Sequence, residues 1–260
     1  MAKIIAIINQ KGGVGKTTTA VNLGAGLTRL GKRVLLIDAD AQANLTESLG
    51  IVRPDELEVT LTGIIWKIIN DKEVDPEEGI IHLPEGMDLL PANIDLTGLE
   101  ITLMSALNRE MILKQYTESV RDGYDYILID CMPSLSVLTL NALVCADSVL
   151  IPVNASFLSL KGLEVLFLVT GKIRKQMNRN LQIEGILITR FGARKNYEKD
   201  IRKILMEEYG DRIRIFDEVI PDTVRVAESS AVGKSIYEYD PDGNAAKAYM
   251  ALSRKVAENE

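Results

Sequence analysis

The chain has 260 residues, of which 47% are hydrophobic, and this is enough apolar material to build a large buried core. Its formal net charge of −7 argues against a protein that is basic over its whole surface. No run of about eighteen apolar residues is present, which excludes a membrane-spanning helix, and the first apolar run starts at residue 3, so we expect no signal peptide.

The first predicted elements are a strand, a glycine-rich turn and a helix. Residues 3–8 form a β-branched run typical of a buried strand, and the segment from Thr17 onward has apolar residues at helical spacing. The glycines between them let backbone N–H groups converge on an anion, and the start of a helix adds its positive end. This predicts a phosphate site, in which Lys16 reaches the β- and γ-phosphates and the Thr17 hydroxyl ligates Mg²⁺. The turn consists of Lys11, Gly12, Gly13, Val14, Gly15, Lys16 and Thr17, and Thr18 follows it.

Two further strands are expected to deliver carboxylates to the same region. Residues 33–37 predict the second strand, which leads into Asp38 and Asp40. Residues 126–129 predict a later buried strand, which ends at Asp130. Ligands of open parallel sheets bind at the carboxyl ends of the strands, so these carboxylates are expected to face the phosphate loop. We expect Asp130 to hold Mg²⁺ through water.

The stretch at residues 53–86 is the least informative part of the chain. It is charged and surrounds an apolar segment at residues 61–69, which we predict to be a helix with Trp66 in the core. His82, the only histidine, lies before Pro84 in a predicted turn, and we assign it no catalytic role.

The rest of the chain continues to alternate between strands and helices. Such alternation predicts an α/β fold with a doubly wound, mostly parallel sheet flanked by helices. We expect residues 1–260 to form one domain. The other predicted strands are residues 87–90, 148–153 and 183–189 with short edge pieces at 213–216 and 219–220, and the other predicted helices are 96–120, 137–144, 160–177, 197–209 and 242–257.

Positive charge is concentrated in the last third of the chain. Residues 171–225 contain 13 Lys and Arg against 9 Asp and Glu, a net charge of +4 on a chain that is acidic elsewhere. The helix predicted from Tyr197 carries Lys199, Arg202 and Lys203 at i, i+3 and i+4, which places them on one face. Such a face is either simply solvated or contacts phosphates, and phosphate contact would give salt-sensitive, sequence-independent binding of nucleic acid.

The phosphate loop departs from the ordinary pattern G-x-x-x-x-G-K-[ST], because Gln10 replaces the first glycine and a second lysine, Lys11, lies inside the loop. The sequence KGGVGKTT resembles the deviant Walker A motif of the ParA/MinD branch of P-loop ATPases. The segments KRVLLIDADAQANLT, YDYILIDCMPSLSVLTLNAL and IPDTVRVAESSAVGKSIYEYDP extend a resemblance to ParA-type partition ATPases over residues 2–241. The resemblance implies a P-loop NTPase fold and a Mg²⁺-dependent ATPase that is slow without a stimulating partner.

The resemblance also implies roles for particular residues. In this family the extra lysine, here Lys11, reaches across an ATP-sandwich homodimer to the partner's phosphates. The second aspartate of the D-x-D sequence, here Asp40, positions the attacking water, so catalysis would depend on Lys11, Lys16 and Asp40. The implied nucleotide-binding residues are Lys11, Gly12, Gly13, Val14, Gly15, Lys16, Thr17 and Thr18, with Arg190, Pro221 and Asp222 near the adenine, and the implied Mg²⁺ ligands are Thr17 and Asp130.

Members of this family bind DNA non-specifically as ATP-bound dimers, through basic residues of the C-terminal third. Arg194 and Arg225 lie at matching positions and, with Lys199, Arg202 and Lys203, are the predicted DNA contacts. The resemblance further implies DNA partitioning, a ParB-like partner that stimulates hydrolysis, and a cytoplasmic protein that associates with the nucleoid when ATP is bound. Because the first predicted strand starts at residue 3, we expect no separate N-terminal DNA-binding domain.

Several segments depart from the family pattern. DAQAN, which begins at Asp40, replaces DPQGN, and CMPS, which begins at Cys131, replaces CPPS. Both lie in switch-like loops, so they bear on the rate of hydrolysis more than on nucleotide binding. Residues 154–162 replace an acidic-aromatic stretch, and TRFG, which begins at Thr189, replaces a TMYD-like pattern near the expected adenine site.

Three other interpretations remain open. A MinD-like membrane-cycling ATPase would need a basic amphipathic C-terminal helix, whereas AAKAYMALSRKVAENE is Ala-rich and ends acidic, so we expect no stable membrane association. An iron–sulfur reductase would need cysteines that bridge a cluster, and Cys131 and Cys145 match this poorly. A nucleotide-switched scaffold with little hydrolysis is compatible with the altered residues after Asp40.

Overall fold

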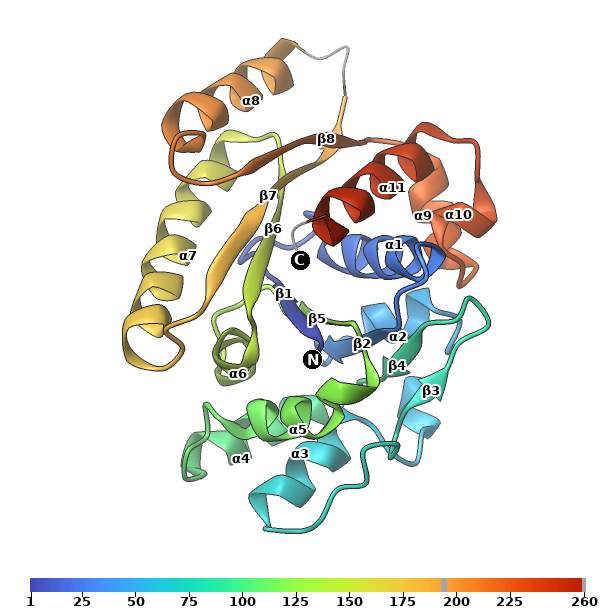
Figure 1. Cartoon of the computed structure of the whole chain (residues 1–260), viewed down its shortest axis with the longest axis vertical. Coiled ribbons are helices and arrows are strands. Elements are labelled where there is room, and N and C mark those ends of the chain that lie inside the picture. The colour runs from blue at the N-terminus through green and yellow to red at the C-terminus, as the bar shows by residue number, and fades with distance from the viewer. Residues whose placement is uncertain (193–195, 259–260) are drawn as a thin grey trace.

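An eight-stranded sheet runs through the computed structural model, which describes residues 1–192 and 196–258 (Figure 1). Its strands are β1 (Lys3–Ile7), β2 (Val34–Ala39), β3 (Ile81–His82), β4 (Asp88–Leu90), β5 (Tyr126–Cys131), β6 (Ser148–Asn154), β7 (Gln182–Phe191) and β8 (Ile215–Pro221). Their order across the sheet is β3-β4-β2-β5-β1-β6-β7-β8, and every neighbouring pair is parallel except β3 and β4. The predicted doubly wound, mostly parallel α/β fold is therefore confirmed.

Helices cover both faces of this sheet (Figure 1). They are α1 (Lys16–Arg29), α2 (Asn44–Ser48), α3 (Leu61–Ile69), α4 (Leu96–Ser105), α5 (Ile112–Val120), α6 (Val137–Cys145), α7 (Phe157–Gln176), α8 (Asn196–Tyr209), α9 (Val224–Ala231), α10 (Ile236–Tyr239) and α11 (Asn244–Ala257), with short 3₁₀ turns at Pro54–Glu56 and Arg121–Gly123. The core on one face is shared with α3 to α8, and the core on the other face is shared with α1, α2, α10 and α11.

The central strands are apolar on both sides because both of their faces are covered. In β1, Ile4 and Ala6 point into the core under α3 to α8, whereas Ile5 and Ile7 point into the core under α1 and α11. Parallel strands buried on both faces have continuous apolar sequences instead of alternating ones. This is why the β-branched runs in the sequence located the strands correctly.

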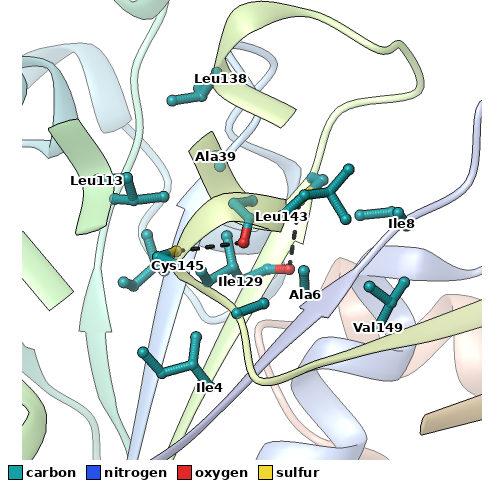
Figure 2. Packing of buried hydrophobic residues seen from close by; sticks show 14 of the residues in the cluster. Ile4, Ala6, Ile8, Ala39, Leu113, Ile129, Leu138, Leu143, Cys145 and Val149 are labelled. Carbon is teal, nitrogen blue, oxygen red and sulfur yellow. Dashed lines mark hydrogen bonds between the residues drawn. The ribbon is translucent and has the colours of Figure 1, made fainter. Parts of the chain in front are cut away.

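Helix α6 covers the middle of the sheet next to α5 (Figure 2). Ile129 of β5 packs here in one cluster with Leu113 of α5 and Leu143 of α6. Cys145, at the end of α6, donates its thiol to the carbonyl of Ala142 at 3.3 Å, and burial raises its pKa to about 12. Both cysteines are free and buried, so they pack in the core and offer no thiol to a cluster shared with a second subunit.

The predicted single helix over residues 96–120 is wrong, because the chain breaks into α4 and α5. Asn108 has a φ of 50°, in the left-handed region that a continuous helix does not allow. The Nη1 atom of Arg109 donates to the carbonyl of Met104 at 2.8 Å and so satisfies a carbonyl near the end of α4. Neither glycine nor proline marks this break in the sequence.

The prediction that Trp66 lies in the core is also wrong, since this side chain is 47% exposed. The buried face of α3 consists of Leu61, Ile64 and Ile65, and Trp66 follows them onto the outer side. The Lys72 ammonium lies 4.4 Å from the centre of the Trp66 ring, so a cation–π contact covers part of the indole.

Three details at the ends of the sheet also differ from the sequence-based expectations. His82 lies in β3, paired antiparallel with β4, and not in a turn. The two predicted edge pieces near residues 213–220 form one strand, β8, which pairs with β7 through irregular register. Helices α9 and α10 were not predicted from the sequence.

The last helix packs against the first. A Cβ atom at Gly26 of α1 would lie 2.6 Å from the Tyr237 hydroxyl and would also collide with Ser253 of α11, so glycine is required for this close approach. On α11, Tyr249, Leu252 and Val256 are buried in the same core as α1. In the parts of the chain that the structure describes, no helix combines the length and apolar content needed to cross a bilayer.

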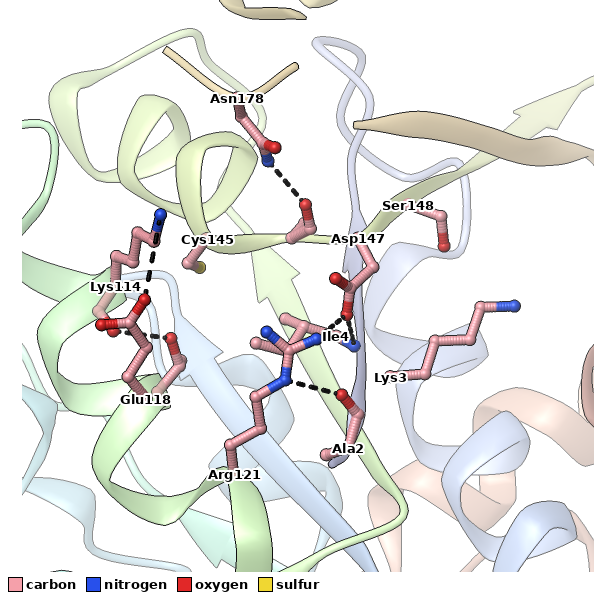
Figure 3. A network of polar contacts seen from close by, with 12 residues as sticks. Ala2, Lys3, Ile4, Lys114, Glu118, Arg121, Cys145, Asp147, Ser148 and Asn178 are labelled. Atoms are coloured by element: carbon pink, nitrogen blue, oxygen red, sulfur yellow. Dashed lines mark hydrogen bonds and ion pairs between the residues drawn. The ribbon is translucent and has the colours of Figure 1, made fainter. Parts of the chain in front are cut away.

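Polar side chains tie three segments together at the amino end of the central strands (Figure 3). Asp147, immediately before β6, accepts hydrogen bonds from the backbone N–H of Ile4 at 2.8 Å and from Nη2 of Arg121 at 2.5 Å. The Nε atom of Arg121 also donates to the carbonyl of Ala2 at 2.9 Å. Because Ile4 is buried, its N–H depends on the Asp147 carboxylate for a partner.

We expect Asp147→Ala to lower the free energy of unfolding by about 2 kcal/mol, because it leaves one buried N–H unsatisfied and the Arg121 guanidinium unpaired. Asp147→Asn should have a smaller effect, since its amide oxygen can still accept a hydrogen bond. Urea denaturation followed by circular dichroism measures both, with Asp122→Ala as an exposed control. Equal stability of Asp147→Ala and the control would contradict the proposed role of this contact.

Candidate active site

The turn between β1 and α1 has the backbone that its glycines require. Gly13 and Gly15 have φ of 71° and 82°, in the left-handed region that glycine adopts without strain. Gly15 caps α1, and the backbone N–H of Lys11 is held by the Asn9 side chain at 2.9 Å. The unpaired N–H groups at the start of α1 therefore point toward the space above the turn, as in an anion site.

A cavity of about 600 Å³ opens above this turn, within the range typical of sites for small ligands. Most of the predicted nucleotide residues line it: Gly12, Gly13, Gly15, Lys16, Thr17, Thr18, Arg190, Pro221 and Asp222. Asp40 lines it as well. Val14 is fully buried and does not line the cavity, and Lys11 also lies outside its described lining. The fold therefore brings the phosphate loop together with residues 190–222, although these segments are separated by more than half the length of the chain.

Asp130 is buried behind Thr17, which lines the cavity, and is not itself among the described residues of the lining. The Thr17 hydroxyl donates to Oδ2 of Asp130 at 2.6 Å, whereas Oδ1 of Asp130 is buried without a hydrogen-bond partner. The pKa of Asp130 is raised to about 8. Burial is the main cause and the nearby Asp38 adds to the increase, whereas the hydrogen bond from Thr17 and the charge of Lys16 act against it. A buried carboxylate oxygen without a hydrogen-bond partner, next to a hydroxyl oxygen, offers the oxygen ligands that a hard divalent cation prefers.

The two aspartates at the carboxyl end of β2, Asp38 in its last residues and Asp40 just after it, have different surroundings. Asp38 is 0% exposed and accepts hydrogen bonds from the backbone N–H and hydroxyl of Thr46, at 2.9 and 2.7 Å, and from the backbone N–H of Asp40 at 3.2 Å. Burial raises the pKa of Asp38 to about 7, although the hydrogen bonds from Thr46 lower it. Asp40 instead faces the cavity, so it is the aspartate that can reach a ligand there.

The segment after Asp40 folds with an unusual backbone. Ala43 is buried and has a φ of 52°, in the left-handed region where an alanine side chain costs roughly 1–2 kcal/mol. The family pattern DPQGN has glycine at this position, which would adopt the same backbone without strain. The substitution of alanine is therefore accommodated in the observed loop, whose Gln42 and Asn44 line the cavity.

Arg190 joins the phosphate loop to the opposite wall of the cavity. Its Nη1 donates to the carbonyl of Gly13 at 3.3 Å, and its Nε lies 3.7 Å from a carboxylate oxygen of Asp222. Arg190 also has a φ of 51°, which is uncommon for a residue other than glycine. Thr189 fixes this end of β7, because its hydroxyl donates to the carbonyl of Val14 at 2.7 Å.

Helix α9 forms a wall of the cavity that the sequence interpretation missed. Thr223 accepts a hydrogen bond from the backbone N–H of Arg225 through its side chain and caps this helix, and Val226, Ala227 and Ser230 line the cavity. The signal available in the sequence was Thr223, a residue type favoured at the N-cap of a helix, followed by Val226, Ala227 and Ser230 at i+3, i+4 and i+7 on one helical face.

The predicted DNA-contacting residues are not gathered in one place on this chain. Lys199 and Lys203 are exposed on α8, where Lys203 lies 3.6 Å from Glu207, and Arg202 donates to the carbonyl of Asp217 at 3.3 Å. Arg225 lies on a different helix, α9, which Figure 1 shows at the right beside α10 and α11, whereas α8 is at the upper left. Arg194 lies outside the described residues.

Comparisons with known proteins find relatives of this chain over nearly its whole length. A family model described as "AAA domain" matches residues 2–183. The chain is 43% identical to the sporulation initiation inhibitor protein Soj of Bacillus subtilis, over 100% of both chains. It is 40% identical to the chromosome partitioning protein ParA of Caulobacter vibrioides, over 99% of this chain and 95% of that one. The structure of cobyrinic acid a,c-diamide synthase from Mycobacterium smegmatis with bound ATP analogue and magnesium matches with a TM-score of 0.84 at 33% identity, covering 98% of this chain and 93% of that one.

Proposed function

Since this chain belongs to the ParA/MinD family of P-loop ATPases, we propose that it is a partition ATPase, which binds ATP with Mg²⁺, forms an ATP-sandwich dimer, binds DNA non-specifically and releases it on hydrolysis. The observation that carries the proposal is the cavity lined by the phosphate loop and Asp40, with the buried Asp130 hydrogen-bonded to Thr17 of its wall. Full-length similarity to a chromosome partitioning protein supports the cellular role. A ParB-like partner would stimulate the slow hydrolysis, and the protein would associate with the nucleoid in the cytoplasm.

Thr17 and Asp130 fit a magnesium ion. The unpartnered buried Oδ1 of Asp130 and the adjacent Thr17 hydroxyl are the hard oxygen donors that Mg²⁺ prefers. The bound ion would supply positive charge to the β- and γ-phosphate oxygens. The ATP analogue and magnesium bound to the similar structure support Mg²⁺ as the ion.

The chain's own residues would perform the rest of the chemistry. Lys16 and the N–H groups at the start of α1 would stabilise negative charge that develops on the transferred phosphoryl group. Asp40 would orient the attacking water, because its carboxylate faces the cavity while Asp38 is buried in hydrogen bonds to its own loop. Lys11 would act on the nucleotide of a second copy of this chain.

The position of α11 favours partition over membrane cycling. A helix that lies on a membrane must expose an apolar face. The apolar residues of α11, among them Tyr249 and Leu252, are instead buried against α1 and the sheet. The exposed side of α11 carries polar residues such as Lys247 and Arg254.

DNA binding tests the proposal. Arg225→Ala should weaken retention of all DNA sequences alike, and each lost phosphate contact should reduce the log–log salt slope by about one. Lys199→Ala tests by the same measurement whether the exposed face of α8 contacts DNA. Filter retention against salt concentration, with ATP and with ADP, measures both variants.

Arg53→Ala, an exposed arginine paired with Glu56 and far from the predicted contacts in sequence, serves as the matched control. Retention should require ATP, because only the dimer would combine two basic surfaces. Equal retention with ATP and with ADP would break the proposed link between dimer and DNA.

A further inference from the structure

Lys11 is held on its own chain by two side chains at the end of β6, which we call the cradle: Asn154 and Ser156. We infer that the cradle holds the Lys11 ammonium in the monomer and releases it when two chains dimerise, so that Asn154 and Ser156 are positioning residues for Lys11. The inference rests on the proposed function, because it assumes that Lys11 acts across a dimer.

Hydrogen-bond geometry defines the cradle. The Nζ atom of Lys11 donates to Oγ of Ser156 at 2.9 Å and to Oδ1 of Asn154 at 3.2 Å. The Ser156 hydroxyl also donates to Oδ1 of Asn154 at 3.3 Å, which links the two acceptors. The ammonium group therefore has a defined position although Lys11 lies in a loop.

The sheet fixes where the cradle lies relative to the phosphate loop. Strand β6 is the direct neighbour of β1. Just past the end of β1, the Asn9 side chain donates to the carbonyl of Pro152 in β6 at 2.8 Å. Since the loop that carries Lys11 and the strand that carries Asn154 are attached in this way, the contact does not depend on a mobile segment.

The cradle keeps Lys11 away from its own nucleotide site. Lys16 lines the cavity, whereas Lys11 is not among the described residues that line it. The two lysines of one short loop thus point to different places. Lys11 is thus turned away from the phosphate site of its own chain. It can reach the nucleotide of a second chain only if it gives up its hydrogen bonds to the cradle.

The chemistry of the cradle allows this exchange. Both acceptors are neutral, and no carboxylate of the described residues lies within ion-pair distance of the Lys11 ammonium. Hydrogen bonds to neutral oxygens fix the direction of the side chain but leave its charge uncompensated. Phosphate oxygens, which are ionised, make stronger charge-assisted bonds and would replace the cradle.

The holding step is tested on the nucleotide-free monomer by the rate at which an N-hydroxysuccinimide ester acylates Lys11, measured by mass spectrometry. The double variant Asn154→Ala/Ser156→Ala should raise this rate about tenfold, because its ammonium is no longer held. Asn154→Asp should lower it, because a carboxylate holds the ammonium more tightly. Lys247 provides an internal reference, and Ser105→Ala is a matched serine control on the surface.

The release step is tested by sedimentation with a non-hydrolysable ATP analogue. The double variant should dimerise with a Kd about tenfold lower than that of the wild type, since no contact has to be broken first. Asn154→Asp should dimerise more weakly. The affinity of each monomer for the analogue should stay unchanged, because neither cradle residue lines the cavity.

The outcomes separate the inference from the proposed function. An unchanged acylation rate in the double variant overturns the cradle even if the wild type dimerises normally. Faster acylation together with weaker dimerisation overturns the release step and assigns the two residues to the dimer contact itself. A wild type that stays monomeric with the analogue overturns the proposed dimer and the release step, while acylation still decides whether the cradle holds Lys11.

Discussion

Lys16→Ala is expected to lower the affinity for ATP at least about 100-fold. Lys16 is only 8% exposed, it lines the cavity, and it lies at the first position of α1, directly beside the anion site. Charge-assisted hydrogen bonds to phosphate are among the strongest that proteins make, and Lys11 does not line the cavity of its own chain in the described structure, so it is not placed to replace them. Isothermal titration calorimetry with ATP and Mg²⁺ measures the loss.

Lys247→Ala is the control for Lys16, since Lys247 is exposed on α11. Circular dichroism measures whether both variants are folded, so that a loss of ATP affinity can be separated from unfolding. An ATP affinity of Lys16→Ala within about threefold of the wild type would refute the assignment of the phosphate site.

Asp40→Ala is expected to reduce ATP hydrolysis by about 100-fold or more while leaving ATP binding intact. Positioning and activation of a reacting group by a carboxylate contributes about 10²–10⁴-fold to a rate. In the proposed site, binding would depend on Lys16, Thr17 and Asp130, which the substitution leaves unchanged. The variant should therefore accumulate as an ATP-bound dimer, detected by size-exclusion chromatography together with phosphate release.

Glu47→Ala is the matched control for Asp40, because Glu47 is an exposed acid on α2 in the same region and does not line the cavity. Asp40→Asn keeps the shape of the side chain and removes its charge, so it shows whether the carboxylate itself is needed. If Asp40→Ala turns over ATP at the wild-type rate, Asp40 does not position the water, and Asp38 is the next residue to test. A wild type that itself hardly hydrolyses ATP would instead point to a nucleotide-switched scaffold.

The sheet could be predicted because its signals are local. Buried parallel strands need long apolar runs, and β1, β2 and β5 each have one. The break between α4 and α5 could not be found in this way, since it depends on the left-handed Asn108 and on a hydrogen bond from Arg109 to an earlier carbonyl. Trp66 was misplaced because the apolar segment of α3 is nearly uniform and does not reveal which side faces the sheet.

The residues of the candidate site also divide into those with a local sequence signal and those without one. The phosphate loop and the aspartates at the carboxyl ends of β2 and β5 could be located from the sequence, because motif and strand end are neighbours in the chain. The cradle could not, since Asn154 and Ser156 are distant from Lys11 in the sequence and no motif links them. The wall formed by α9 was missed because a short helix gives only a weak periodic signal.

The contact between α1 and α11 makes the order of synthesis matter. The phosphate loop and α1 leave the ribosome well before residues 244–257, which form the helix that packs on α1. Until then the side of α1 that packs on α11 is uncovered, and a nascent chain that exposes such a face is prone to aggregation. The cavity above the phosphate loop is completed only when α11 has folded, because Tyr249 of this helix is part of its lining.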